Sequence, residues 1–281
     1  MSVERLSVVE RLVAAGRPSG QPPDIDGVLS HLPSLALRAY AGSGRVRSAP
    51  AHSRCPKGCS VIDTIVFDVD GTLVDTNYQH ALAWYGAFRR FDITPALWRI
   101  HRAIGMGGDQ LVEAVAGRGA EESHGDDLRE AWSEEYDKHL PHVQPFEGAI
   151  DLLEDARSRD LRVVLASSGQ RDHVEHYLDL LDGRRLAHDW TTSEDAEQTK
   201  PAPDLVQTAM SKVGGEHAVM IGDSTWDAEA AERAGIPTYA VRTGGFSVEE
   251  LRQAGARQVY DSLAELRADL SSVISAGVPR R

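Results

Sequence analysis

The sequence predicts an α/β protein, a doubly wound parallel sheet with an α-helical segment inserted after the first strand. Two observations predict this class. From residue 61 onward, short runs rich in Val, Ile and Leu alternate with amphipathic helical segments, which is the pattern of βαβ units on a sheet buried on both faces. One long stretch, residues 77–144, interrupts this alternation with helical periodicity and no persuasive strand.

The N-terminal segment, residues 1–60, differs in texture from the rest. It holds eight Lys or Arg residues against four acidic ones, and Gly, Pro and Ser recur in the stretches SGQPP and AGSGRVRSAPAHSRCPKGCS. A segment of this kind buries too little apolar surface to offset the entropy lost on ordering. We therefore expect a largely disordered extension. An organelle-targeting peptide, which the acidic residues disfavour, and an upstream start codon are alternatives.

The two cysteines, Cys55 and Cys59, lie four residues apart in that extension. No second pair or nearby ligand set accompanies them, so we interpret them as reduced and structurally idle rather than as a zinc site.

The core is predicted to comprise residues 61–76 and 145–275. Its predicted strands are VIDTIVFD, LRVVLASS, HAVMIGD and PTYAV. Two helical stripes support the doubly wound arrangement, because apolar residues recur at helical spacing in each. The stripes are Ile150, Leu153 and Ala156, and then Leu205, Val206, Ala209, Met210 and Val213 after Pro203.

The inserted segment, residues 77–144, is predicted to be a helical cap. Ala81, Leu82, Tyr85 and Phe88 carry the helical spacing, and the segment is too long for a simple crossover. Ligands of open α/β sheets bind beyond the carboxyl ends of the strands. An insertion that rises from this edge is placed to act as a lid.

Carboxylates and hydroxyls follow three of the predicted strands. Asp68 and Asp70 end or follow TIVF, Ser167 and Ser168 follow VVLA, and Asp223 follows VMIG with Asp227 four residues later. A single aspartate at a strand end is usually a turn or helix cap. Several crowded carboxylates are costly without a cation, and Mg²⁺ prefers hard oxygen ligands. The set therefore predicts a Mg²⁺ site at one edge of the sheet.

Charge and hydropathy exclude several classes of partner. Residues 61–281 carry 22 basic against 39 acidic side chains, whereas binding to a phosphate backbone needs clustered Lys and Arg. No apolar run approaches the roughly 20 residues that cross a bilayer, and acids interrupt the first residues, MSVERLSVVERLV. We expect a cytoplasmic protein, monomeric or homodimeric, that binds neither nucleic acid nor membrane.

Four motifs in order give the chain a resemblance to a known family. They are DVDGT at 68–72, the strand that ends in Ser167, Lys200 within TKPAPD, and GDSTWD at 222–227. With them the chain resembles, over about residues 61–270, the haloacid dehalogenase-like (HAD) superfamily. Within it, the chain is most similar to the phosphatases and phosphomutases with a helical cap, such as phosphoglycolate phosphatase and β-phosphoglucomutase. The resemblance implies a Rossmann-like core.

The resemblance also implies a phosphatase that acts on a small phosphorylated metabolite through an aspartyl-phosphate. Asp68 would be the nucleophile. Asp70 would be the general acid and then the base, and its main-chain carbonyl would ligate the metal. Mg²⁺ would be held by Asp68, that carbonyl and Asp223.

The remaining motif residues are implied to bind phosphate or to support the site. Ser167 would hydrogen-bond a phosphoryl oxygen, and Lys200 would bridge Asp68 and the phosphoryl group. Main-chain N–H groups around Val69, Asp70 and Ser168 would complete the phosphate site. Asp227 would support the metal ligands from behind.

Cap and hinge residues bear on the choice between phosphatase and mutase. Thr76 and His80 occupy positions that in sugar phosphomutases of the β-phosphoglucomutase type support the acid/base and couple it to cap closure, although histidine occurs there in phosphatases too. A mutase needs a second cationic phosphate site on the cap loop around Gly105, where this chain has HRAIGMGGDQ. Arg102 is the nearest cation and could face either solvent or the site.

Three alternatives remain beside the phosphatase. A sugar phosphomutase shares the core residues. A phosphonoacetaldehyde hydrolase needs a cap lysine, and Lys138 is the only one in the insertion, late in that segment. A non-catalytic binding protein on the same fold would be expected to lack Asp68, Asp70 or Lys200, whereas all three are present. The dehalogenase branch lacks the second aspartate of the first motif, which this chain retains as Asp70.

Overall fold

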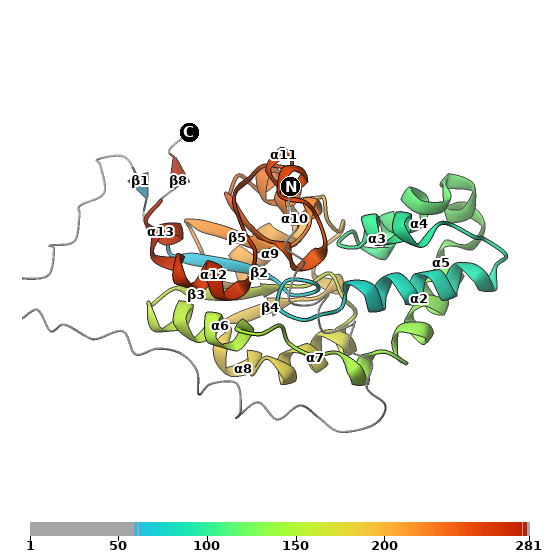
Figure 1. Ribbon diagram of the computed structural model, residues 1–281, viewed down its shortest axis with the longest axis horizontal. Helices are drawn as coiled ribbons and strands as arrows, with labels where there is room; N and C mark the ends of the chain where they lie inside the picture. The colour runs from blue at the N-terminus through green and yellow to red at the C-terminus, as the bar shows by residue number, and fades with distance from the viewer. Residues whose placement is uncertain (1–58, 61, 277, 280–281) are drawn as a thin grey trace, which may run out of the picture. The chain divides into compact units, whose positions relative to one another are not determined.

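Six parallel strands form the central sheet, in the order β4-β3-β2-β5-β6-β7. The computed structural model describes residues 59–60, 62–276 and 278–279 of the chain (Figure 1). The strands are β2 Thr64–Asp68, β3 Arg162–Ala166, β4 Asp189–Thr191, β5 Ala218–Gly222, β6 Thr238–Val241 and β7 Ala256–Tyr260. The α/β doubly wound prediction is confirmed, because the chain crosses from strand to strand through helices on both faces of this sheet.

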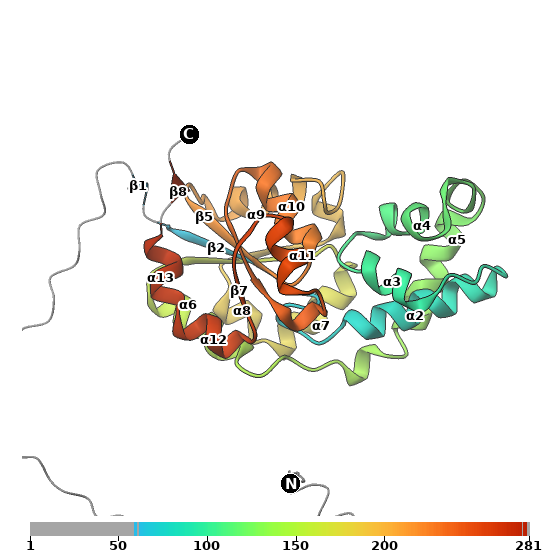
Figure 2. The ribbon, with the colours of Figure 1, turned by 45° about the horizontal axis from the view of Figure 1, so that its top comes forward.

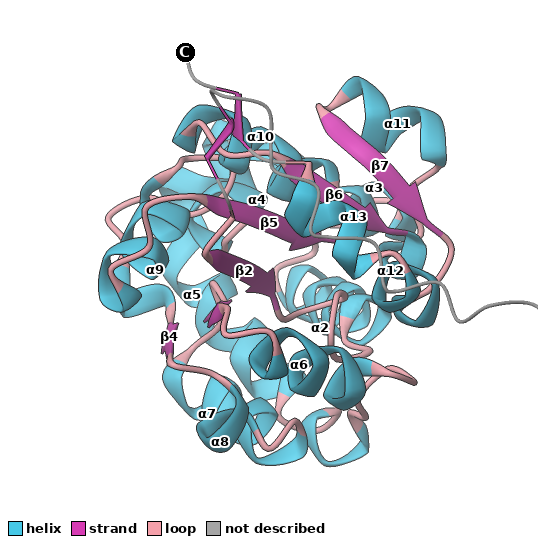
Figure 3. Ribbon diagram, turned by 90° about the vertical axis from the view of Figure 1, so that its left-hand side faces the viewer, coloured by secondary structure: helices cyan, strands magenta, loops and turns pink. Residues whose placement is uncertain are grey.

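Alternate residues of each strand enter different parts of the core. Ile65 and Phe67 of β2 belong to one buried cluster, which includes residues from helices α6, α7, α12 and α13. Val66 belongs to a second cluster with residues of α9 and α10. Successive side chains of a strand point to opposite faces, so the helices cover both faces, as Figure 3 shows.

The core helices follow the strands in turn. They are α6 Ala149–Ser158, α7 Arg171–Leu180, α8 Gly183–Leu186, α9 Asp204–Val213, α10 Thr225–Ala234, α11 Val248–Gln253, α12 Leu263–Ala268 and α13 Leu270–Ser275, with 3₁₀ turns at η3 Ser193–Asp195 and η4 Arg242–Gly244. Helix α9 buries Leu205, Val206 and Ala209, as its sequence indicates. In α6 the predicted stripe is wrong at one position, because Ile150 is 37% exposed and Leu152 is buried instead.

Two strands of the sheet were not predicted from the sequence. Strand β4 has three residues, DWT, and only its last is fully buried. Strand β7, ARQVY, lies at the sheet edge with exposed Arg257 and Gln258 inside it. Neither contains the continuous apolar run that marks a strand buried on both faces, and this explains why both were missed.

The predicted extension, residues 1–60, lies largely outside the described residues, and Cys55 lies there with it. Its last two residues form strand β1, Cys59–Ser60, which pairs antiparallel with β8, Val278–Pro279.

Helices fill the segment predicted as the cap. They are α2 Asn77–Arg90, α3 Leu97–Ala103, α4 Gly108–Ala116 and α5 Arg118–Tyr136, followed by the 3₁₀ turn η2 Leu140–His142. They bury a cluster of their own that includes Trp84, Phe88, Ile100 and Leu128. Figures 1 and 2 show these helices beyond the carboxyl end of β2. Of the apolar residues expected to line α2, Leu82 is 46% exposed, and the buried stripe includes Ala81, Trp84 and Phe88.

No helix among the described residues is both long enough and apolar enough to cross a lipid bilayer.

Candidate active site

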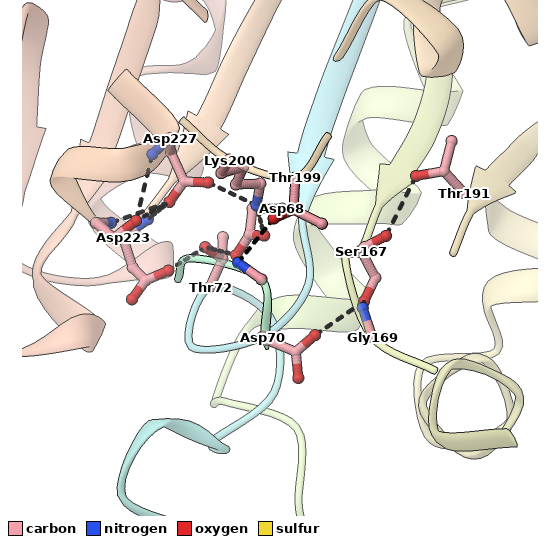
Figure 4. Close-up of polar contacts among 12 residues, drawn as sticks. Asp68, Asp70, Thr72, Ser167, Gly169, Thr191, Thr199, Lys200, Asp223 and Asp227 are labelled. Atoms are coloured by element: carbon pink, nitrogen blue, oxygen red, sulfur yellow. Dashed lines mark hydrogen bonds and ion pairs between the residues drawn. The ribbon is translucent and has the colours of Figure 1, made fainter. Parts of the chain in front are cut away.

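The carboxyl ends of β2, β3 and β5 bring the predicted residues together (Figure 4). Asp68 is the last residue of β2, Ser167 follows β3, and Asp223 follows β5. These three strands are neighbours in the sheet and run parallel. Their carboxyl ends therefore lie at one edge, so that residues far apart in the sequence become neighbours.

Asp68 is buried and held from two sides. The ammonium of Lys200 donates to its Oδ1, and the hydroxyl of Thr72 donates to its Oδ2 over 2.8 Å. The carboxylate is 3% exposed as a residue, and Lys200 is 1% exposed. An aspartate in this position has a fixed orientation toward the space beyond the strand end.

Asp223 is fixed by two donors. Thr72 shares its hydroxyl with Oδ1 of Asp223 over 2.9 Å, and the side-chain amide of Asn77 donates to Oδ2 over 2.9 Å. Gly244 approaches the same carboxylate so closely that an added Cβ would lie 1.9 Å from Oδ2. The position of Asp223 therefore depends on contacts from three separate segments.

Asp227 lies behind the other two carboxylates. Its Oδ2 accepts from the main-chain N–H groups of Asp223 and Ser224 and from the Ser224 hydroxyl, at 3.2, 3.0 and 2.6 Å. Its Oδ1 lies 2.7 Å from the ammonium of Lys200. The residue thus caps helix α10, as Ser224 and Asp227 form a capping box, and it also binds the buried lysine.

The carboxylates outnumber the cation. Burial and the charge of Asp227 raise the pKa of Asp223 to about 7, although hydrogen bonds from Asn77 and Thr72 oppose the shift. Burial and Asp227 also raise the pKa of Asp68 well above its usual range, against the effect of Lys200. Burial would lower the pKa of Lys200, but the charges of Asp227 and Asp68 outweigh it and raise that pKa. This cluster favours an additional positive charge.

A divalent cation fits this cluster. One carboxylate oxygen each from Asp68, Asp223 and Asp227 lies within 4.8 Å of the others. All are hard oxygen donors of the kind that Mg²⁺ prefers. Burial and the charge of Asp227 raise the pKa values of Asp68 and Asp223, and a cation would offset both effects.

Asp70 faces a different set of groups. Its Oδ1 lies 3.0 Å from Nε2 of His80 and accepts from the hydroxyl of Thr76 over 3.2 Å. Its Oδ2 accepts from the hydroxyl of Ser167 over 2.9 Å. Burial raises the pKa of Asp70, but the hydrogen bond and charge of His80, with smaller effects of Ser167 and Lys200, outweigh it and lower the pKa to about 2.

The first turn of α2 contacts both groups of carboxylates. Thr76 and His80 touch Asp70, whereas Asn77 between them reaches Asp223. Gly71 makes room for this approach, since an added Cβ would lie 2.2 Å from the Asn77 amide. Its φ of 82° is also one that glycine adopts without strain.

Aromatic rings support His80 from behind. The ring of His80 stacks on Tyr136 of α5 at 3.9 Å between centroids. The hydroxyl of Tyr136 lies 2.5 Å from that of Tyr177 in helix α7 of the core. These rings restrict the imidazole and thereby fix the contact that it makes with Asp70.

A cavity of about 60 Å³ opens above these residues. We call it the reaction cavity. The core and the insertion both line it. The core contributes Asp68, Asp70, Lys200, Ser168 and Gly169, and the insertion contributes His80, Trp84, Leu111, Trp132 and the loop Ile104–Gly108. Asp68 therefore faces a space that both parts of the chain enclose.

The loop between α3 and α4 touches the segment that carries Lys200. The N–H of Gly107 donates to the hydroxyl of Thr199 over 3.1 Å, and the side chain of Gln110 donates to the Thr199 carbonyl over 2.8 Å. An added Cβ on Gly107 would lie 2.1 Å from the Thr199 hydroxyl. Gly105, the predicted hinge glycine, has φ 101° and lies against Ser224 and Trp226.

Arg102 points away from the reaction cavity. Its guanidinium contacts Glu250 of α11 at 2.5 Å and lies 3.9 Å from the centroid of the Phe246 ring. Its main-chain carbonyl accepts from the indole of Trp226 over 3.3 Å. Of the two alternatives, the site is not met, because the side chain lines no part of the reaction cavity. It lies instead at the protein surface, 33% exposed, in an ion pair with the core.

Two other placements differ from the sequence analysis. The hydroxyl of Ser167 donates to Asp70 and accepts from the N–H of Gly169, and this residue does not line the cavity, whereas Ser168 does. Thr72 and Asn77 were missed. Thr72 stands inside the DVDGT motif, and this could have drawn attention to it, but Asn77 has no local signal.

Comparison with known proteins agrees with this arrangement. The haloacid dehalogenase-like hydrolase family matches residues 65–241. The pyrophosphatase PpaX of Oceanobacillus iheyensis is 29% identical over 183 residues, which cover 64% of this chain and 83% of that protein. The validoxylamine A 7'-phosphate phosphatase of Streptomyces hygroscopicus subsp. limoneus is 26% identical over 185 residues, 61% of this chain and 81% of that protein.

A solved structure extends the comparison to the fold. A hydrolase from Pseudomonas syringae superposes with a TM-score of 0.71 and 31% identity, over 75% of this chain and 98% of that one. The family match spans more than half of the chain and includes Asp68, Lys200 and Asp223. The predicted family is confirmed: the chain belongs to the haloacid dehalogenase-like hydrolases.

Proposed function

We propose that the protein is a Mg²⁺-dependent phosphatase that releases inorganic phosphate from a small phosphorylated metabolite through an aspartyl-phosphate on Asp68. The observation that carries this proposal is the position of Asp68. It is held by Lys200 and Thr72 at the wall of the reaction cavity, within reach of Asp223. The names of the relatives support phosphate removal as the reaction.

Asp68 is the nucleophile of the first step. One of its carboxylate oxygens forms a bond to phosphorus while the bond between phosphorus and the ester oxygen breaks. Lys200 and Thr72 orient that carboxylate. Lys200 also offsets negative charge as the phosphoryl group approaches.

Asp70 moves the protons of both steps. It donates a proton to the departing ester oxygen, and then takes a proton from the water that attacks the aspartyl-phosphate and regenerates Asp68. A carboxyl with a pKa of about 2 is ionised at neutral pH. A phosphate dianion in the cavity adds a like charge beside it and raises that pKa, which favours the acid form when substrate is bound.

Asp68, Asp223 and the main-chain carbonyl of Asp70 would hold Mg²⁺. The ion supplies charge neutralisation at the phosphoryl group when it is bound. Asp227 binds Lys200 and the N–H groups of the β5–α10 turn, and these contacts support a role behind the ligands.

The helical insertion, residues 77–144, serves as a cap over the site. Its loop Ile104–Gly108 and Trp132 enclose the reaction cavity together with the core. Such enclosure excludes bulk water from the reacting groups and strengthens their electrostatic effects.

A sugar phosphomutase is a weaker candidate. A mutase must retain a bisphosphorylated intermediate, and Lys200 is the only Lys or Arg among the described residues that line the reaction cavity. Arg102, the nearest cation of the cap loop, pairs with Glu250 instead.

The test uses 4-nitrophenyl phosphate as a generic substrate. We expect phosphate release that requires Mg²⁺ and falls by at least about 10³ in Asp68→Asn, since this change removes the covalent route. Circular dichroism checks that the variant is folded. Substantial turnover by folded Asp68→Asn, or in excess chelator, contradicts the proposal.

A further inference from the structure

A second cavity, of about 260 Å³, adjoins the reaction cavity. We call it the side cavity. It shares Gly108, Trp132 and Ser168 with the lining of the reaction cavity. Its polar lining comes from Asp109, Arg129, Gln170, Ser193, Glu197 and Thr199. A phosphoryl group at Asp68 would leave the rest of a substrate to extend into this space, which is slightly smaller than the ligand cavities of about 300–1,000 Å³ that are typical of proteins.

The one arginine of the side cavity is already engaged. Arg129 of α5 donates to Glu121 and Asp126 over 3.0 and 2.9 Å, and to the carbonyl of Gly108 over 3.0 Å. Two carboxylates therefore offset its charge. Recruiting this guanidinium to a second anion would require the loss of these contacts.

Carboxylates dominate the remaining charge. Asp109 and Glu197 both line the side cavity. Lys200, the cation of the reaction cavity, is buried between Asp68 and Asp227. Among the described residues that line the two cavities, each Lys or Arg thus contacts carboxylates, so a second anionic group on a substrate would meet net negative charge.

Uncharged hydrogen-bonding groups complete the lining. Gln170 accepts from the hydroxyl of Ser133 through Oε1 over 3.0 Å, an orientation that leaves its amide N–H groups as donors. Ser193 presents a hydroxyl, which both donates and accepts. Amide, hydroxyl and carboxylate groups together suit a partner that carries several hydroxyls.

We propose that the side cavity binds the leaving group, and that the preferred substrates are phosphomonoesters of hydroxyl-rich alcohols without a second anionic group. The inference rests on the proposed phosphatase function. It assigns Gln170, Ser193 and Glu197 to recognition of the alcohol.

Two open-chain substrates with the same number of carbons test the charge preference. Sorbitol 6-phosphate and 6-phosphogluconate differ chiefly in the carboxylate of the second. We expect kcat/KM for 6-phosphogluconate to be lower by about 10-fold, because Asp109 and Glu197 repel that carboxylate. Pyrophosphate should also be a poorer substrate than sorbitol 6-phosphate. Equal or inverted preferences overturn the inference.

A charge-reversal pair tests the location. Glu197→Lys should raise the ratio of kcat/KM for 6-phosphogluconate to that for sorbitol 6-phosphate by about 10-fold, since repulsion becomes attraction. Glu194→Lys is the matched control. This substitution changes the charge by the same amount in the same segment, but Glu194 pairs with Arg171 and does not line the side cavity. The ratio measured for Glu194→Lys should therefore stay at the wild-type value. A ratio that is unchanged in Glu197→Lys, or that moves equally in both variants, contradicts the assignment.

Turnover of 4-nitrophenyl phosphate separates the two proposals. If that substrate is hydrolysed with Mg²⁺ but the anionic substrates are preferred, only the side-cavity inference fails. If the folded protein hydrolyses none of these phosphates, the proposed function fails and the inference falls with it.

Discussion

The ammonium of Lys200 lies between two carboxylates, in contact with Asp68 and 2.7 Å from Asp227. Asp227, in the first turn of helix α10, therefore positions the lysine, and the lysine in turn positions Asp68 at the end of strand β2. Because the three side chains are buried, breaking the contact leaves unpaired charge in a medium of low dielectric constant.

Lys200→Met should destabilise the protein and nearly abolish turnover. Removing one partner of a buried ion pair costs about 3–5 kcal/mol, and the remaining carboxylates then repel each other. Mg²⁺ should raise the Tm of the variant more than that of the wild type, since the ion replaces the lost positive charge. Thermal unfolding with Mg²⁺ and with chelator measures this.

The control for Lys200 is Lys212→Met. Lys212 is partly exposed and pairs with Asp195 over 2.9 Å, so its loss should cost only about 0–1 kcal/mol. If Lys200→Met unfolds at the same temperature as Lys212→Met, the buried pair does not have the importance that we assign to it.

Asp70→Asn should slow turnover by roughly 10²–10⁴, because it removes the group to which we assign proton transfer. With a good leaving group such as 2,4-dinitrophenolate, bond cleavage needs little acid help. The first step should then remain faster than hydrolysis of the aspartyl-phosphate, and rapid mixing should show a burst of phenolate. A loss in both steps as large as that of Asp68→Asn would refute this division of roles.

Stabilisation by Mg²⁺ should increase with pH. The pKa of Asp223 is raised to about 7 in the metal-free protein by burial and by Asp227. Because the folded-state pKa is raised, stability is fully present below the unfolded pKa of 3.8 and is lost as pH rises from there through the folded pKa of about 7. A bound cation offsets this loss, so the gain in Tm on adding Mg²⁺ should be larger near pH 8 than near pH 5.5.

Asp223→Asn is the comparison for that experiment. The variant lacks the titrating carboxylate, so its response to Mg²⁺ should be small and should vary less across the same pH range. A pH-independent gain in wild-type Tm would show that Asp223 does not bind the ion.

Arg102→Ala should weaken the contact between helix α3 and the core. Arg102 pairs with Glu250 and lies over Phe246, contacts worth together about 1–2 kcal/mol. We expect kcat/KM to fall by about 3- to 10-fold, chiefly through KM, in steady-state assays. Arg99→Ala on the same helix is the control, because Arg99 is exposed. Equal kinetics for the two variants would show that the contact of Arg102 with Glu250 and Phe246 does not position the insertion over the site.

Gly107→Ala should impair turnover without unfolding the chain. Its Cβ would lie 2.1 Å from the Thr199 hydroxyl, so the loop and the segment next to Lys200 must separate. A fall in kcat/KM of about 10-fold is expected from such misplacement. Gly119→Ala is the matched control, since an added Cβ there meets nothing within 4 Å. Wild-type kinetics for Gly107→Ala would mean that the loop adapts freely.

Much of the fold was predictable because four core strands contain continuous apolar runs. Strands β4 and β7 were not, since Asp189 and Trp190 are only partly buried and Arg257 and Gln258 are exposed. The errors at Ile150 and Leu82 have another cause. Apolar spacing identifies a helix, but its exact facing depends on the neighbours that it packs against.

The candidate site was predictable where parallel strands end. Asp68, Ser167 and Asp223 come together because β2, β3 and β5 are neighbours. The contact of Ser167 with Asp70 could not be predicted, because it depends on the direction of side chains brought together by tertiary packing. The side cavity could not be predicted either. Residues such as Arg129 and Glu197 belong to no motif, and they come together only because the insertion packs against the core.

The first turn of α2 has a consequence for chimaeric enzymes. Thr76 and His80 bind Asp70 while Asn77 binds Asp223, so this turn belongs chemically to the core even though it begins the insertion. If a foreign cap were joined to the core at residue 77, Asn77 and His80 would be replaced. The contacts of Asp223 and Asp70 would then both be disturbed. A splice placed after residue 80 would let a new specificity be grafted while the native carboxylate contacts are inherited intact.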